Sequence, residues 1–91
     1  MTYREEFPDF DPATMPSIPA GWTDQSRHND TCPSFYTGNG KVVFVDFADV
    51  SLREWQDGKR FNVKVDPEVA DCNEFLLETD DWQEVLKFVE A

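Results

Sequence analysis

"SFYTGNGKVVFVDF", residues 34–47, predicts a β-hairpin and largely decides the fold class. Two runs of β-favouring residues flank the turn at 38–40, Gly-Asn-Gly, which can supply the positive φ angles of a tight hairpin turn. In the second run Val43, Val45 and Phe47 share one face, and the opposite face is also mostly apolar. A strand that is apolar on both sides is typical of the interior of a sheet, so we expect this run to be central.

A further strand is predicted by "KRFNVKV", residues 59–65, where apolar and polar side chains alternate. Phe61, Val63 and Val65 should face the core, and the turn before them is expected at Asp57-Gly58. Between the two strands, residues 49–55 fit either a helical turn or a bent strand, and both remain open.

The last part of the sequence predicts a short strand at 74–78, "EFLLE", followed by a helix over 80–91. Asp80 is a good N-cap, and Gln83 three residues later completes a capping-box pattern. The apolar stripe of an amphipathic helix follows at Trp82, Val85, Leu86 and Val89. The core should combine this stripe with both strands; its expected members are Val43, Val45, Phe47, Phe61, Val63, Val65, Trp82, Leu86 and Val89.

Residues 1–31 hold four of the six prolines and are expected to form an irregular arm. Asp11 and Pro12 can start one helical turn. The arm's apolar anchors, Phe7, Phe10, Ile18 and Trp22, either complete the core or bind a partner. We therefore predict one α+β domain: an irregular arm (1–31), a three- to four-stranded, mostly antiparallel sheet (32–79), and a C-terminal helix (80–91) packed on one face.

Composition bounds the functional classes. The net charge of −11 opposes direct binding to nucleic acid or to membranes. No apolar run approaches eighteen residues, and residues 1–6 carry no basic region followed by an apolar stretch, so we expect no membrane span, no secretory signal and a cytoplasmic location. In a reducing cytosol Cys32 and Cys72 are expected as two thiols rather than as a disulfide.

Catalytic and metal patterns are weak. His28, the one histidine, precedes Cys32 by four residues in a polar loop, and these two residues with Cys72 do not make a zinc set. As a calcium loop, residues 66–78 carry Asp71 where glycine belongs and Leu77 where the bidentate glutamate belongs. We expect no enzyme, metal or cofactor. A deep pocket that gathered His28, Cys32 and Asp24 or Asp30 would reopen the enzyme hypothesis.

The strongest functional signal is charge. Residues 66–91 contain nine acids and one base, Lys87. Some of these acids suit turns and the start of a helix, and the rest can be an ordinary solvated face. The alternative is a continuous negative surface for a basic partner, formed by Glu68, Asp71, Glu74, Glu78, Asp80, Asp81 and Glu84. Glu74 and Glu78 share a face of this surface if their strand is regular.

In length and acidity the chain resembles small DNA-mimic inhibitors, including anti-CRISPR proteins of phages and mobile elements. The stretch "GWTDQSRHNDTCPSF", residues 21–35, also resembles a segment of small bacterial proteins; this resemblance covers roughly residues 8–36 and implies no activity. The first resemblance implies a non-enzymatic inhibitor that occupies a positively charged, nucleic-acid-binding surface of a partner protein. The alternative is a bacterial housekeeping module that binds a partner through its apolar arm or a sheet edge.

Overall fold

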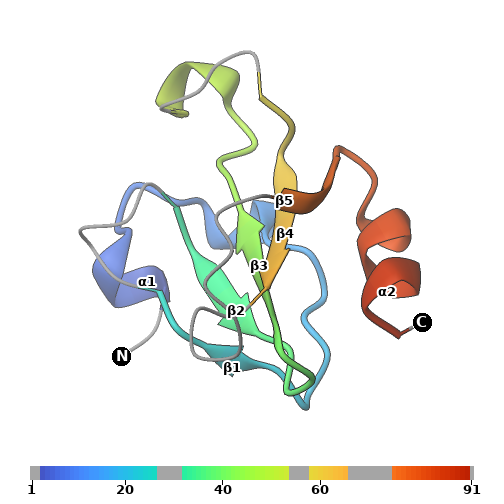
Figure 1. Cartoon of the computed structure of the whole chain (residues 1–91). Coiled ribbons are helices and arrows are strands. Elements are labelled where there is room, and N and C mark those ends of the chain that lie inside the picture. The colour runs from blue at the N-terminus through green and yellow to red at the C-terminus, as the bar shows by residue number, and fades with distance from the viewer. Residues whose placement is uncertain (1–2, 27–31, 54–57, 66–74, 91) are drawn as a thin grey trace.

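The structure is a computed structural model that describes residues 3–26, 32–53, 58–65 and 75–90. Its described elements are, in chain order, the helix α1 (Tyr3–Glu6), the 3₁₀ helix η1 (Pro12–Thr14), the strands β1 (Thr23–Asp24), β2 (Ser34–Tyr36) and β3 (Lys41–Val45), the 3₁₀ helix η2 (Val50–Leu52), the strands β4 (Phe61–Val65) and β5 (Phe75–Thr79), and the helix α2 (Trp82–Glu90). In the view of Figure 1, α1 lies to the left, towards β1 and β2, and α2 lies to the right, towards β4 and β5.

The five strands form one antiparallel sheet whose spatial order, β1-β2-β3-β4-β5, is also their order along the chain. The predicted α+β class is confirmed, and β3 is the middle strand as expected. The expected three to four strands are too few, because Thr23 and Asp24 form an additional strand that pairs with Tyr36 and Phe35 of β2. β1 has two residues, which are too few for an alternating apolar pattern to be recognised in the sequence.

The core lies on the face of the sheet where the registers align Phe35, Val43, Val63 and Leu77 across four strands. Val43, Val63 and, in α2, Val85 are fully buried. The nine expected core residues divide into two groups. Val43, Val45, Phe47, Phe61, Val63 and Val89 are buried, whereas Val65, Trp82 and Leu86 are partly exposed. The helix is therefore turned so that Val85, rather than Leu86, points most directly at the sheet.

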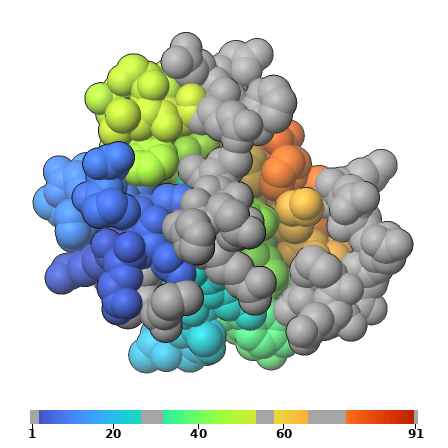
Figure 2. All heavy atoms as spheres, turned by 90° about the vertical axis from the view of Figure 1, so that its left-hand side faces the viewer, coloured from blue at the N-terminus to red at the C-terminus, as the bar shows by residue number. Residues whose placement is uncertain are grey.

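Residues 3–26 complete this core. Phe7 and Phe10 are buried in the same cluster as Phe35 and Phe47, and Tyr3 meets Phe10 edge-on at 5.6 Å between ring centroids. Figure 2 shows the N-terminal residues (blue) packed beside the η2 segment (yellow-green). Phe7 and Phe10 thus belong to the core, as the first of the two interpretations had it, whereas Ile18 and Trp22 pack against it and are partly exposed.

Local turn chemistry agrees with the sequence at most positions. Asp11 caps η1 by accepting a hydrogen bond from the Ala13 amide, with Pro12 in the first turn. In the hairpin, Gly38 and Gly40 have φ values of 87° and 86°. The segment at 49–55 is settled as a helical turn for its described part, because η2 covers Val50–Leu52.

The predicted N-cap of the last helix is wrong by one residue. The helix begins at Trp82, and Asp81 is the residue whose carboxylate accepts a hydrogen bond from the Gln83 amide at 3.0 Å. The carbonyl of Asp81 also accepts from the amides of Glu84 and Val85. Asp80, the predicted cap, instead has partners in Lys59 and Arg60, the two residues before β4.

Candidate functional site

Four of the seven acids expected on the negative surface lie in the described residues. Glu78 is in β5, Asp80 and Asp81 form the link to α2, and Glu84 is in the first turn of that helix. The other three, Glu68, Asp71 and Glu74, lie outside the described residues. All four described acids are exposed. Because the link has two residues, the end of β5 and the start of α2 form one corner, which we call the β5–α2 corner (residues 78–84).

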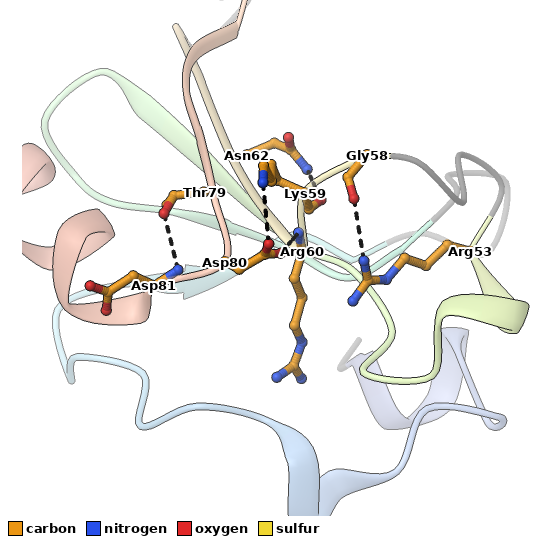
Figure 3. Close-up of polar contacts among 8 residues, drawn as sticks. All are labelled: Arg53, Gly58, Lys59, Arg60, Asn62, Thr79, Asp80 and Asp81. Atoms are coloured by element: carbon orange, nitrogen blue, oxygen red, sulfur yellow. Dashed lines mark hydrogen bonds and ion pairs between the residues drawn. The ribbon is translucent and has the colours of Figure 1, made fainter.

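Asp80 is engaged within the protein (Figure 3). Its Oδ1 accepts a hydrogen bond from the Arg60 amide at 2.9 Å, and its Oδ2 lies 3.6 Å from Nζ of Lys59. The Arg60 N–H, and to a smaller extent the Lys59 charge, hold the pKa of Asp80 below the usual aspartate value. The carboxylate therefore ties the end of β5 to the start of β4, and its charge is partly compensated.

Asp81 has a structural role as well. Its amide donates to Oγ1 of Thr79 at 3.0 Å (Figure 3). Its carboxylate caps α2 by accepting a hydrogen bond from the Gln83 amide. A carboxylate at this position also complements the positive end of the helix dipole. Two of the predicted acids are thus explained by the fold, although the Asp81 carboxylate remains accessible.

Glu78 and Glu84 differ from these two. Both are exposed, and neither side-chain carboxylate makes a hydrogen bond or an ion pair with any of the described residues. Lys87, the basic residue of α2, lies one turn beyond Glu84, and no ion pair joins them. Glu78 and Glu84 are therefore the acids of the corner whose charge the described structure does not use.

An irregularity in β5 changes which residues share a face. Lys64 pairs with Phe75, and its neighbour Val63 pairs with Leu77. Leu76 is therefore an extra residue in β5, a β-bulge at the point where the pairing register shifts between Val63 and Lys64. Phe75 therefore lies on the same face as Glu78, which pairs with Asn62. The assumption of a regular strand, from which Glu74 and Glu78 were expected to share a face, is wrong.

That face, opposite the core, is hollowed. A cavity of about 380 Å³ lies over β3, β4 and β5, with Phe44, Phe75, Lys64 and Glu78 in its lining. Nζ of Lys64 lies 5.2 Å from the centre of the Phe75 ring. Figure 2 shows residues of β4 and β5 (amber to orange) at the surface.

The residues of the enzyme hypothesis are not gathered there as far as the described residues show. Cys32 is buried and lines the cavity, whereas Asp24 is not among its described lining residues. His28 and Asp30 lie outside the described residues, and so does Cys72, so the state of the two thiols stays a prediction. Among the described residues, no three His, Cys, Asp or Glu side chains lie close enough to hold a metal ion.

Sequence reasoning missed two residues of this region. Phe75 and Leu76 are 47% and 41% exposed, as are Val50 and Leu52 near η2, at 46% and 50%. The sequence does contain a signal, the three consecutive apolar residues in "EFLLE". A strand with one buried face needs an apolar side chain only at every second position, so such a run predicts apolar side chains on both faces. That signal did not show which end of the run would be exposed.

Comparisons with known proteins add no relative. No protein family, no curated protein and no solved structure matches the chain significantly. None of the helices in the described residues has the length and apolarity needed to cross a membrane.

Proposed function

We propose that this protein is a non-enzymatic binding protein that presents its β5–α2 corner to a positively charged surface of a partner protein. The observation that supports it is the pair of exposed carboxylates, Glu78 and Glu84, without a cationic partner among the described residues. Asp81, which caps the helix at the same corner, adds a third accessible negative charge.

The chemistry of such a corner fits a groove that normally holds nucleic acid. Duplex DNA carries one charge per roughly 1.7 Å of its axis, so a groove built for it rewards a dense row of carboxylates. Complementary charge acts mainly on the rate of encounter and weakens as salt is added. An inhibitor of the DNA-mimic type, anti-CRISPR proteins included, would use these properties to displace nucleic acid from its partner.

A second candidate is an interaction module whose partner binds an apolar sheet edge, with the acidity serving solubility. The exposure of Phe75 and Leu76 on β5 favours it. The apolar arm does not, since Phe7 and Phe10 are buried in the core. The two candidates differ in whether binding depends on the acids.

A matched pair of variants tests the proposal. Glu78→Gln/Glu84→Gln removes two charges from the corner, and Asp9→Asn/Glu90→Gln removes two exposed charges elsewhere. Each immobilised protein is exposed to the heparin-binding proteins of a bacterial extract and eluted with increasing salt, with and without competing duplex DNA.

We expect the wild-type protein and the control to retain the same partner, to release it at the same salt, and to lose it to duplex DNA. The corner variant should release it at markedly lower salt. Equal elution from both variants would show that the corner acids are only a solvated face, and would leave the second candidate.

A further inference from the structure

We infer that the outer edge of β5 accepts an extended, basic segment of the partner as an added strand, with a lysine or arginine of that segment beside Glu78. This inference rests on the proposed function and specifies how the partner is held. An added strand gains affinity from main-chain hydrogen bonds and specificity from its alternate side chains.

The two edges of the sheet differ. The edge at β1 is two residues long, and the Asp24 carboxylate there accepts hydrogen bonds from the amides of Tyr3 and Ser26. The edge at β5 is five residues long. In the described part of the chain no strand lies beyond it, and no backbone hydrogen bond outside the β4–β5 pairing involves it. Short edge strands resist pairing with other chains, whereas a longer edge exposes a row of donors and acceptors.

Apolar side chains accompany this edge. Phe75 and Leu76 are exposed at the first positions of β5, and the bulge directs Phe75 to the face that carries the cavity. An incoming strand would cover part of both side chains, and removing this apolar surface from water favours binding. The bulge also limits regular pairing to a short stretch, so the added strand should be short.

Charge selects the occupant. On the cavity face Glu78 lies on the edge strand, while Lys64 lies one strand further in and already approaches the Phe75 ring. A cationic side chain on the incoming strand would therefore meet Glu78 first; Asp81 and Glu84 follow it in the chain at the start of α2. Opposite charges on neighbouring strands stabilise the pairing of the two strands.

The same charges argue against a second copy of this chain as the occupant. Each copy carries a net charge of −11, so β5–β5 pairing would bring two acidic corners together. Like charges on neighbouring strands are destabilising, and the overall repulsion adds to that. The acids of the corner would stabilise pairing with a basic strand and destabilise pairing with a second copy of this chain.

The probe is a capped peptide of about nine residues that alternates valine with lysine, a typical strand length. Its control has the same sequence with N-methyl groups on alternate backbone nitrogens of one edge, which keeps the charge but removes the donors that strand addition needs. Two N-methyl peptides, one for each edge, cover both ways of pairing. Binding is measured by titration with the full chain, and the amide resonances of residues 75–79 are followed.

We expect the unmodified peptide to bind, to protect amides of β5 from exchange, and to lose at least tenfold in affinity with one of the two N-methyl controls. Glu78→Gln should weaken binding several-fold, whereas Glu90→Gln at the other end of α2 should change it less than twofold. Equal affinity for all three peptides would overturn strand addition while leaving a charge-driven function intact. If none of the three peptides binds, strand addition is overturned as well, whatever the experiment with the immobilised proteins and the bacterial extract shows.

Self-association gives the remaining outcome. If sedimentation shows a dimer that the peptide does not dissociate, and if the β5 amides are protected in that dimer, the edge belongs to a second copy and the inference is wrong. A concentration-independent monomer is the expected result.

Discussion

The side-chain amide of Asn39 donates a hydrogen bond to the backbone carbonyl of Val89 at 2.9 Å, although the two residues are 50 positions apart in the sequence. Asn39 lies in the turn between β2 and β3, and Val89 is in the last turn of α2, where carbonyl groups have no partner within the helix. The hairpin turn therefore fixes the end of the helix against the sheet.

Removing this contact should destabilise the fold modestly. Asn39→Ala should lower the free energy of unfolding by about 0.5–1.5 kcal/mol, the usual net value of one hydrogen bond, in chemical denaturation. Asn39→Asp keeps the acceptor for the Thr37 hydroxyl but removes the donor and adds a negative charge near the helix C-terminus. It should cost at least as much as Asn39→Ala at neutral pH. An unchanged stability for both variants would contradict the contact.

The rotation of α2 can be tested with neighbouring residues. Val85→Ala should lower the free energy of unfolding by about 1.5–3 kcal/mol, because its side chain is fully buried against the sheet. Leu86→Ala removes more atoms but from a partly exposed site, so it should cost less than Val85→Ala. Urea denaturation of both variants gives the comparison. A larger loss for Leu86→Ala would mean that the helix is turned as the sequence pattern had suggested.

The cap of α2 makes a separate prediction. Asp81→Ala should cost about 0.5–2 kcal/mol, because the Gln83 amide loses its acceptor and the helix dipole loses a compensating charge. Asp81→Ser is the control, since serine also caps, and it should restore most of that stability. Thermal or chemical unfolding followed by circular dichroism measures both. Equal losses for alanine and serine would argue that Asp81 does not act as a cap.

Asp80 predicts a dependence of stability on pH. The pKa of Asp80 is lowered from 3.8 in the folded protein, first by the Arg60 N–H, so its ionised form favours folding. This contribution is present above the unfolded pKa and is lost as pH falls through the lower, folded pKa. Asp80→Asn should therefore destabilise the protein at neutral pH, and the difference from wild type should shrink as pH falls below about 4. Salt should reduce the effect, because the side chain is exposed.

A stability difference between Asp80→Asn and wild type that stayed constant down to the lowest pH would contradict this origin. Asp49→Asn is a useful comparison. The pKa of Asp49 is also lowered, by hydrogen bonds from the Ser51 hydroxyl and amide, but no lysine takes part. Its pH dependence should therefore be less sensitive to salt.

Local signals predicted those elements whose partners are close in sequence. The hairpin, the central position of β3 and the alternating strand β4 follow from apolar periodicity and from two glycines in the turn. Strand β1 could not be predicted in this way, because two residues carry no periodicity. It forms because β2 offers it a partner, and because Asp24 holds the Tyr3 amide at 2.7 Å.

The candidate site shows the same division. The acids of the corner were visible as composition, but composition could not show that Asp80 is held by Arg60 and Lys59, or that Asp81 is the cap. The bulge at Leu76 depends on how two strands pair, so no property of β5 by itself predicts it. The shared face of Phe75 and Glu78 follows from that pairing.

The chain-order arrangement of the sheet has a consequence for synthesis on the ribosome. Each strand can pair with the one made just before it, so the sheet can grow by local steps, which favours fast folding. The aromatic residues of the N-terminal segment contact one another, as Tyr3 does Phe10, but their partners in the sheet come later in the chain. Phe10 packs on Phe47, and Tyr3 on Phe35, so these rings stay in water until β3 and its flanking residues have been made. During that interval the nascent chain carries its greatest exposure to aggregation, and α2 then closes over a sheet that is already assembled.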